Sequence, residues 1–299
     1  MTRTLLAALL LLGACATARA EPSGCPPAGY DQSRLEALKT AEWEIADPSE
    51  RDRFARALTA CLAAPDPHLR DGIAFEALQH MMRARQLSPA TMMALQDDLE
   101  ARLTAPEGAG FERPFAALVL AEVARADRVE PYLTPARRER LIVAGTGFLR
   151  GVRDYRGFDQ REGWRHGVAH GADLMLQLSL NPALGRPELE RIRDAVAAQV
   201  APDSHAYVFG EGERLAAPIL YIARRGVFTD DEWSAWLAQV AAPAPYPSWD
   251  GTFSSEAMLR KRHNATAFFS ALYLNARLSE NSEDDALLPG AEAALRSLP

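Results

Sequence analysis

Basic residues are scarce in this chain. It has 33 Lys and Arg against 40 Asp and Glu, which gives a net charge of −7 at pH 7. Lys39 and Lys261 are the only lysines, and all other cations are arginines. Proteins that bind nucleic acid neutralise phosphates with a basic surface. We therefore expect no nucleic-acid partner.

Long apolar segments are also missing. A membrane-spanning helix needs about 20 consecutive apolar residues, and the longest run, Leu5 to Leu12, is far shorter. That run follows Arg3 near the start of the chain, an order typical of a secretory signal peptide. We expect an exported protein of the bacterial cell envelope, either periplasmic or membrane-anchored.

Two processing sites compete within the signal segment. Ala18-Arg19-Ala20 has the small-residue pattern for cleavage before Glu21, which would make residues 1–20 the signal. Leu12-Gly13-Ala14-Cys15 instead resembles a lipobox, in which residues 1–14 are removed and Cys15 is lipidated. The sequence leaves both open. A lipid on Cys15 is the only membrane attachment that we expect.

Cysteine is rare as well, with three in 299 residues. Once Cys15 is removed or lipidated, Cys25 and Cys61 remain as an even pair, which an oxidising compartment would join. We predict a disulfide between them. The alternative is two unpaired thiols.

Strand patterns are absent too, since no segment of alternating hydrophobicity exceeds a few residues. Helical periodicity, in contrast, recurs from Asp31 onward. Four helix starts carry an N-cap residue followed by proline: Asp47-Pro48, Asp66-Pro67, Ser88-Pro89 and Thr134-Pro135. The predicted helices recur about every 20 residues with short breaks between them, which suits antiparallel neighbours. We predict an all-α fold, an irregular stack of antiparallel helix pairs of HEAT/ARM-like or α/α-repeat type. Residues 21–30 form a tether and residues 31–299 one helical domain.

The segment from Glu162 to Gln177 holds the best candidate site. On a helical wheel of about 100° per residue, one narrow stripe collects the polar side chains while apolar and small residues surround it. The stripe consists of Glu162, His166, His170, Asp173 and Gln177. Trp164 is predicted on the opposite side. A helix packed on most sides with such a stripe would line a cavity or hydrogen-bond to its neighbours.

Three chemistries fit the stripe. His166 and His170, four residues apart, could chelate one divalent metal with Asp173 as an oxygen ligand. Alternatively, Asp173 accepts a hydrogen bond from His170 and orients it as a general base. The third interpretation is a satisfied network between helices that only fixes packing. The sequence leaves the cofactor unknown and does not decide among them.

Two further segments carry candidate ligand-binding residues. Glu211 and Arg214 lie at a predicted helix start, and His263 and Asn264 lie inside the predicted helix Ser255 to Leu278. If His263 approached the stripe, it would supply a third imidazole. Sequence alone does not place it there.

The string Gly163-Trp164-Arg165-His166-Gly167-Val168-Ala169-His170-Gly171-Ala172-Asp173-Leu174, which follows Arg156-Gly157-Phe158, resembles the signature of an uncharacterised bacterial family of helical proteins, a domain of unknown function. Its members show a G-W-x-H-x-x-A-H-x-x-D-L helix after an Arg-Gly loop. The resemblance implies a helical repeat fold in which Trp164, His166, His170 and Asp173 belong to the motif. It implies no activity.

Two functions remain. The first is a binding module that holds a peptide, a protein or a small ligand in its groove. The second is a metal-assisted or His-dependent hydrolase that uses His166, His170 and Asp173. Whether the protein is an enzyme, and which substrate or partner it takes, the sequence does not decide.

Overall fold

The computed structural model describes residues 23–106 and 108–299. Both predicted processing sites, before Glu21 and at Cys15, lie outside the described residues. No helix in the described part of the chain is long and apolar enough to cross a membrane.

The described chain is all-α, as predicted. Its α-helices are α1 (Gln32–Thr40), α2 (Pro48–Leu58), α3 (Glu76–Arg83), α4 (Pro89–Leu103), α5 (Glu112–Val129), α6 (Pro135–Gly151), α7 (Gly167–Ser179), α8 (Arg186–Val200), α9 (Glu211–Ala223), α10 (Asp230–Ala241), α11 (Glu256–Leu278) and α12 (Leu288–Ser297). Four short helical segments join them: η1 (Thr59–Ala63), η2 (His68–Phe75, a π-helix), η3 (Thr252–Ser254) and η4 (Ser282–Leu287). One two-stranded hairpin, β1 (Phe158–Asp159) with β2 (Gly163–Trp164), precedes α7.

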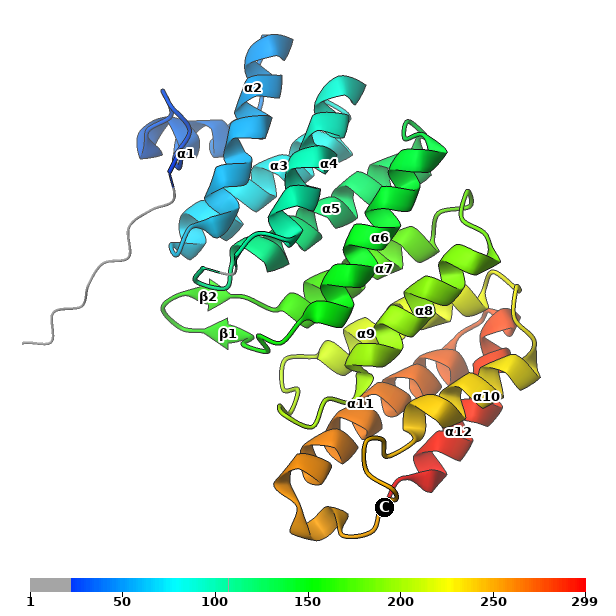
Figure 1. Cartoon of the computed structure of the whole chain (residues 1–299). Coiled ribbons are helices and arrows are strands. Elements are labelled where there is room, and N and C mark those ends of the chain that lie inside the picture. The colour runs from blue at the N-terminus through cyan, green and yellow to red at the C-terminus, as the bar shows by residue number, and fades with distance from the viewer. Residues whose placement is uncertain (1–22, 107) are drawn as a thin grey trace, which may run out of the picture.

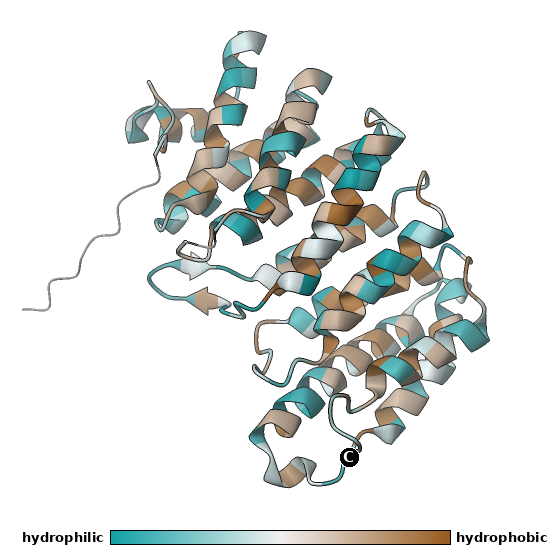
Figure 2. Ribbon diagram, in the orientation of Figure 1, coloured by the Kyte–Doolittle hydropathy of each residue, from teal (hydrophilic) through white to brown (hydrophobic). Residues whose placement is uncertain are grey.

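The helices stack in two layers (Figure 1). In the inner layer α3, α5, α7, α9 and α11 lie side by side in chain order, and the outer layer contains α4, α6, α8 and α10. Helix α12 closes the stack by packing on both α10 and α11. This is the predicted stack of helix pairs. Most helices carry both hydrophilic and hydrophobic residues (Figure 2), as expected when one face is buried and another is wet.

The predicted N-caps form. The side chains of Asp47, Ser88 and Thr134 each accept a hydrogen bond from a backbone N–H in the first turn of α2, α4 and α6, and a proline follows each cap. Such caps each contribute about 1 kcal/mol. Asp66 likewise accepts from the His68 N–H, but it opens η2 and not an α-helix.

Small residues set the spacing of α7 and α6. A Cβ added at Gly145 of α6 would lie 2.8 Å from Leu174 Cδ2, and one added at Gly171 of α7 would lie 3.0 Å from Leu149 Cδ1. A side chain at either position would have to displace these leucines. Glycine at both positions therefore lets the two helices pack closely without moving Leu149 or Leu174.

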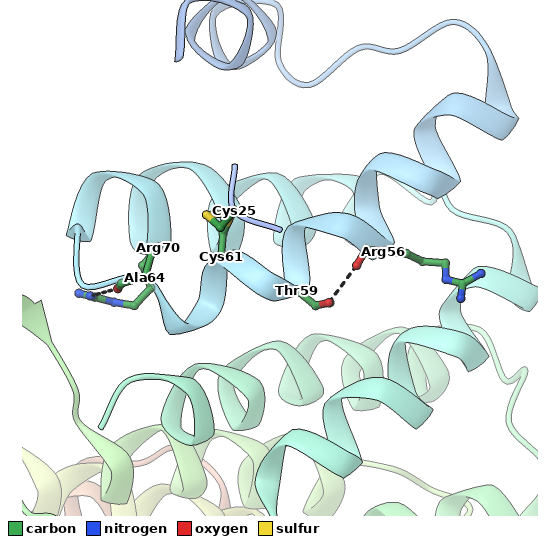
Figure 3. Close-up of a disulfide and its surroundings, with 6 residues drawn as sticks. All are labelled: Cys25, Arg56, Thr59, Cys61, Ala64 and Arg70. Carbon is green, nitrogen blue, oxygen red and sulfur yellow. Dashed lines mark hydrogen bonds between the residues drawn. A yellow bond between two sulfur atoms is a disulfide. The ribbon is translucent and has the colours of Figure 1, made fainter. Parts of the chain in front are cut away.

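The predicted disulfide is present. Cys25 and Cys61 are joined, with Cα atoms 5.0 Å apart and 36 positions between them in sequence. Figure 3 shows the bond connecting the segment before α1 to η1, close to the Thr59 hydroxyl that donates to the Arg56 carbonyl. The bond fixes the N-terminal segment against the first helices of the stack.

Candidate functional site

The segment before α7 is a hairpin, so the predicted helix from Glu162 is wrong in its first turn. Helix α7 begins at Gly167, and Arg165 and His166 extend the hairpin by donating their backbone N–H groups to the carbonyls of Gly157 and Arg156. Gly163 has φ +72°, and a Cβ there would lie 2.9 Å from Pro67 Cβ. Glycine is a poor helix residue but is suited to such a position.

Arg70 holds the hairpin against the rest of the stack. Its side chain is fully buried, Nη1 donates to the Ala64 carbonyl at 2.8 Å, and Nη2 donates to the Glu162 carbonyl at 2.7 Å. The Arg70 guanidinium lies 4.1 Å from the centre of the Phe111 ring, and that of Arg165 lies 4.1 Å from the same ring. These contacts fix the position of the hairpin and therefore of the residues that lead into α7.

His166 is the residue that turns the hairpin into α7. It adopts a left-handed backbone conformation with φ 52°, and its carbonyl accepts the first helical hydrogen bond, from the His170 N–H. Non-glycine residues in this region carry strain of roughly 1–3 kcal/mol, which persists where the surroundings impose it. Only 9% of the residue is exposed. Its ring is therefore placed by the hairpin and not by a helical wheel.

Trp164 lies on the same side as His166, contrary to the prediction that it points away. The two rings stack with centroids 4.7 Å apart and planes 23° apart. Phe158 of β1 and Phe209, in the loop before α9, approach Trp164 with centroid distances of 5.1 and 5.6 Å. We call Phe158, Trp164 and Phe209 the aromatic cluster.

Glu211, the first residue of α9, lies beside His166. Its Oε2 accepts from the Phe209 N–H at 2.9 Å, while Oε1 lies 3.7 Å from His166 Nε2. The residue is only 2% exposed. Both residues are among the predicted candidates, and the structure brings them together across 45 positions because α7 and α9 are neighbours in the inner layer.

Burial disfavours the charged form of His166. Loss of solvent lowers the pKa of the ring, as does the charge of Arg214, while Glu211 and a hydrogen bond to the Phe209 backbone act in the opposite direction. The Nε2 atom is buried and has no hydrogen-bond partner. In the neutral tautomer that is protonated at Nδ1, Nε2 carries the lone pair.

His170, one turn further into α7, is more deeply buried. Burial lowers its pKa to about 3, assisted by His166 and Arg214 and opposed by a hydrogen bond to the Pro114 backbone. Its ring packs edge-on against Phe115 with centroids 5.1 Å apart. Like His166, it has a buried nitrogen without a partner, Nδ1.

Asp173 pairs with Arg214, and no hydrogen bond joins it to His170, as the general-base alternative would need. Arg214 Nη2 donates to Asp173 Oδ2 at 2.9 Å. Burial nevertheless raises the pKa of Asp173 to about 6, with Glu122 contributing in the same direction and Arg214 opposing. Desolvation outweighs the single ion pair because the Arg214 side chain is 49% exposed and its charge is partly screened.

The polar stripe on α7 is one part of a row that crosses the inner layer. Gln177 accepts from Arg128 of α5 at 2.9 Å, and Asp173 accepts from Arg214 of α9. Glu122 of α5 accepts in turn from Gln79 and Arg83 of α3. Polar bridges therefore connect α3, α5, α7 and α9, and in this part of the stripe the interhelical interpretation fits the contacts.

Three predicted residues have other roles. Glu162 accepts from Arg165 Nη2 at 2.7 Å within the hairpin. His263 bonds the Tyr207 carbonyl at 2.9 Å, and Asn264 binds the backbone of the loop before α9 through Pro202, His205 and Tyr207. His263 and Asn264 thus hold the loop that presents Phe209.

The metal hypothesis gains no ligand set from the geometry. Within residues 23–106 and 108–299, no group of three or more His, Cys, Asp or Glu side chains is placed to hold a metal ion. Among the predicted site residues, His166 and Glu211 form only a pair, 3.7 Å apart.

Neither Phe209 nor Phe158 is among the predicted site residues. Phe158 was part of the quoted motif, and Val208-Phe209 is an apolar pair within a loop, directly before Gly210. Exposed apolar residues in a loop are a signal for binding, but the sequence could not show that the two phenylalanines meet at Trp164.

Together, the fold and the site define an all-α helical-stack protein with an aromatic cluster over a buried histidine–carboxylate pair. A family model described as a protein of unknown function (DUF2785) matches residues 101–274, more than half of the chain. The chain belongs to this family. The matched region contains every candidate site residue, whereas α1 to α3 and the disulfide precede it. No curated protein and no solved structure shows significant similarity to the chain.

Proposed function

We propose that this protein is a binding module that takes a peptide or a small ligand on the aromatic cluster. The observation that carries the proposal is the exposure of the cluster: Phe158 is 47%, Trp164 36% and Phe209 36% exposed, and Val208 beside them is 67% exposed. Single apolar residues on a surface are ordinary, but contiguous ones often form interaction sites. Aromatic side chains contribute most to such interfaces.

The rigid support of the cluster strengthens the proposal. Gly157 permits the packing of Phe209, because a Cβ there would lie 2.0 Å from Phe209 Cδ2. The hairpin is fixed by Arg70, and the loop that carries Phe209 is fixed by Asn264 and Glu211. A preorganised apolar surface loses little side-chain entropy when it binds.

Export to the cell envelope belongs to the same proposal. It rests on the signal-like sequence from Arg3 to Leu12 and agrees with the Cys25–Cys61 disulfide, since such bonds persist in oxidising compartments. The partner would then be an envelope protein, a peptide or a small molecule encountered there. Cell fractionation of the parent protein and of Cys15→Ser distinguishes a soluble from a lipidated form, because only a lipidated protein loses its membrane attachment in the variant.

Selection from a random peptide library tests the binding proposal. We expect the protein to enrich peptides that lose binding to Trp164→Ala and keep it with Trp249→Ala, a tryptophan in the loop between α10 and η3. If all enriched peptides bind both variants equally, the aromatic cluster is not the binding surface.

A His-dependent hydrolase is the second candidate, and the His166–Glu211 pair favours it. A neutral imidazole next to a carboxylate can act as a general base on a water placed between them. Turnover of p-nitrophenyl acetate that is lost in His166→Asn and kept in His80→Asn, on α3, would support it. Equal rates in the protein and both variants would exclude a role for His166 in that turnover.

A further inference from the structure

The geometry between α7 and α9 leaves two polar atoms facing each other. His166 Nε2 and Glu211 Oε1 lie 3.7 Å apart, which is longer than a hydrogen bond. When the neutral ring is protonated at Nδ1, Nε2 presents a lone pair, and a carboxylate oxygen only accepts. In that tautomer neither atom satisfies the other, and Nε2 is a buried atom without a hydrogen-bond partner, which is unfavourable.

Only a group that donates two hydrogens can satisfy both atoms at once. A hydroxyl donates one, whereas water, an amide NH₂ and an ammonium donate two or more. The missing partner is thus either water or a nitrogen that carries several hydrogens.

The charges at the site favour a cation. Glu211 is 2% exposed, and among the described residues its only basic partner within 4 Å is His166, whose charged form is disfavoured by burial. The nearby Arg214 is already paired with Asp173 at 2.9 Å. A buried carboxylate without a counter-charge is costly, so a positive ligand would be stabilised there.

The rings around the pair favour the same ligand. Trp164 stacks on His166, and Phe209 approaches both rings edge-on, with centroids 5.6 Å from Trp164 and 6.4 Å from His166. Aromatic faces attract ammonium groups, tryptophan most strongly. The methylene groups attached to an ammonium would contact the exposed apolar surface of Trp164 and Phe209.

We propose that the site recognises a primary ammonium group, which donates to Glu211 Oε1 and His166 Nε2 while its alkyl chain lies on Trp164 and Phe209. This inference rests on the binding function proposed above and names the chemistry of its ligand. A lysine side chain, the amino terminus of a peptide and a free alkylamine all carry this group.

Three small probes separate the elements of the proposal. They share a four-carbon chain: n-butylammonium has N–H donors and charge, butyltrimethylammonium has charge alone, and 1-butanol has neither charge nor a second donor. Binding is followed by the imidazole nitrogen shifts of His166 in NMR spectra. We expect n-butylammonium to bind most tightly, by about tenfold, since charge-assisted hydrogen bonds contribute about 1.5–3 kcal/mol.

Glu211→Gln is the central variant and Glu213→Gln its control, because Glu213 lies two positions further along α9 and is exposed. We expect n-butylammonium binding to weaken about tenfold or more in Glu211→Gln, since a neutral amide replaces the charged acceptor, and to stay unchanged in Glu213→Gln. His166→Asn is a second variant, since asparagine tolerates the left-handed backbone. The Glu211→Gln and His166→Asn variants must both keep the far-ultraviolet circular dichroism spectrum of the parent protein.

Peptides test which kind of molecule supplies the ammonium group. An acetylated peptide with one lysine and a lysine-free peptide with a free amino terminus are compared with an acetylated, lysine-free peptide. Binding of either amine-bearing peptide assigns a peptide ligand, and binding of n-butylammonium alone assigns a small amine.

Equal binding of the three small probes, or n-butylammonium binding that Glu211→Gln leaves intact, would overturn the inference. So would the absence of any amine binding, which would leave water as the bridging group. Selected peptides that need Trp164 but not Glu211 would refute the ammonium inference and leave the proposed binding function standing.

Discussion

Arg70 and Glu162 are 92 positions apart in sequence, yet Arg70 Nη2 donates to the Glu162 carbonyl at 2.7 Å. This hydrogen bond joins η2, near the start of the stack, to the hairpin that leads into α7. Because His166 follows that hairpin directly, the position of its ring depends on a residue in a different helical segment. The candidate site is therefore supported from outside its own motif.

Replacing Arg70 with methionine removes this support. We expect a loss of about 2–4 kcal/mol in unfolding free energy, since the buried guanidinium has several hydrogen-bond partners and the carbonyls of Ala64 and Glu162 would lose theirs. Urea unfolding measures the loss, and hydrogen exchange should rise in the hairpin. Arg85→Met, at a side chain that is 66% exposed, is the control. Equal stability of the two variants would contradict the role of Arg70.

Gly157→Ala tests whether the aromatic cluster needs its present packing. The new Cβ would lie 2.0 Å from Phe209 Cδ2, so the ring must leave its present position beside Trp164. We expect binding of any selected peptide to weaken at least about tenfold, because loss of a hot-spot aromatic typically costs about 2 kcal/mol or more. Calorimetric titration measures the effect.

Gly147→Ala on α6 is the matched control, since a Cβ there meets nothing within 4 Å. Alanine should stabilise that helix by about 0.5–1 kcal/mol and leave binding unchanged. Unchanged binding in Gly157→Ala would show that Phe209 takes no part.

His170 should make the protein sensitive to acid. Its pKa is lowered to about 3 in the folded state from about 6.5 in the unfolded chain. Between these values the unfolded state binds the extra proton, so stability is complete above pH 6.5 and falls as the pH drops towards 3. At pH 5 we expect this effect of His170 to lower the unfolding free energy by about 1–2 kcal/mol relative to its value above pH 6.5.

Urea unfolding at a series of pH values measures this dependence. The side chain at position 170 no longer titrates in His170→Gln. The unfolding free energy of this variant should therefore decline less between pH 6.5 and pH 4 than that of the parent protein. This holds whatever the difference in stability between the two proteins at pH 7.5. Parallel pH profiles would mean that His170 is not the buried neutral ring described above.

Loss of the disulfide should loosen the N-terminal segment. Reduction of Cys25–Cys61, which closes a loop of 36 positions, should lower the unfolding free energy by about 2–4 kcal/mol. Guanidinium unfolding with and without reductant gives the difference. The double variant Cys25→Ala, Cys61→Ala should unfold like the reduced protein and ignore reductant. Binding at the aromatic cluster should persist in all forms, because the disulfide lies outside the hairpin and α9.

Much of the fold could be predicted because its signals are local. Helical periodicity and the caps at Asp47, Ser88 and Thr134 act over a few residues, and the structure has helices at those places. The Cys25–Cys61 bond could be predicted because only these two of the three cysteines remain once Cys15 is removed or lipidated. The start of α7 could not, since Glu162 to His166 fits a helical pattern but is held as a hairpin by Arg70, Arg156 and Gly157.

The candidate site was predictable in its residues but not in its contacts. The sequence singled out His166, Trp164 and Glu211 separately, as polar or aromatic groups in unusual surroundings. Their contacts depend on the neighbouring position of α7 and α9 and on the left-handed backbone at His166. Phe209 was not a predicted site residue, and it belongs to the site only because its ring contacts Trp164 in the folded protein.

The sequence by itself determined the helical class, the cap positions and the choice of side chains, because each depends on interactions between residues close in the chain. Only the tertiary structure decided that Asp173 pairs with Arg214, that Trp164 stacks on His166 and that Glu211 faces Nε2 of that ring. These contacts join segments up to 45 positions apart. Their geometry follows from how whole helices pack, which no local pattern encodes.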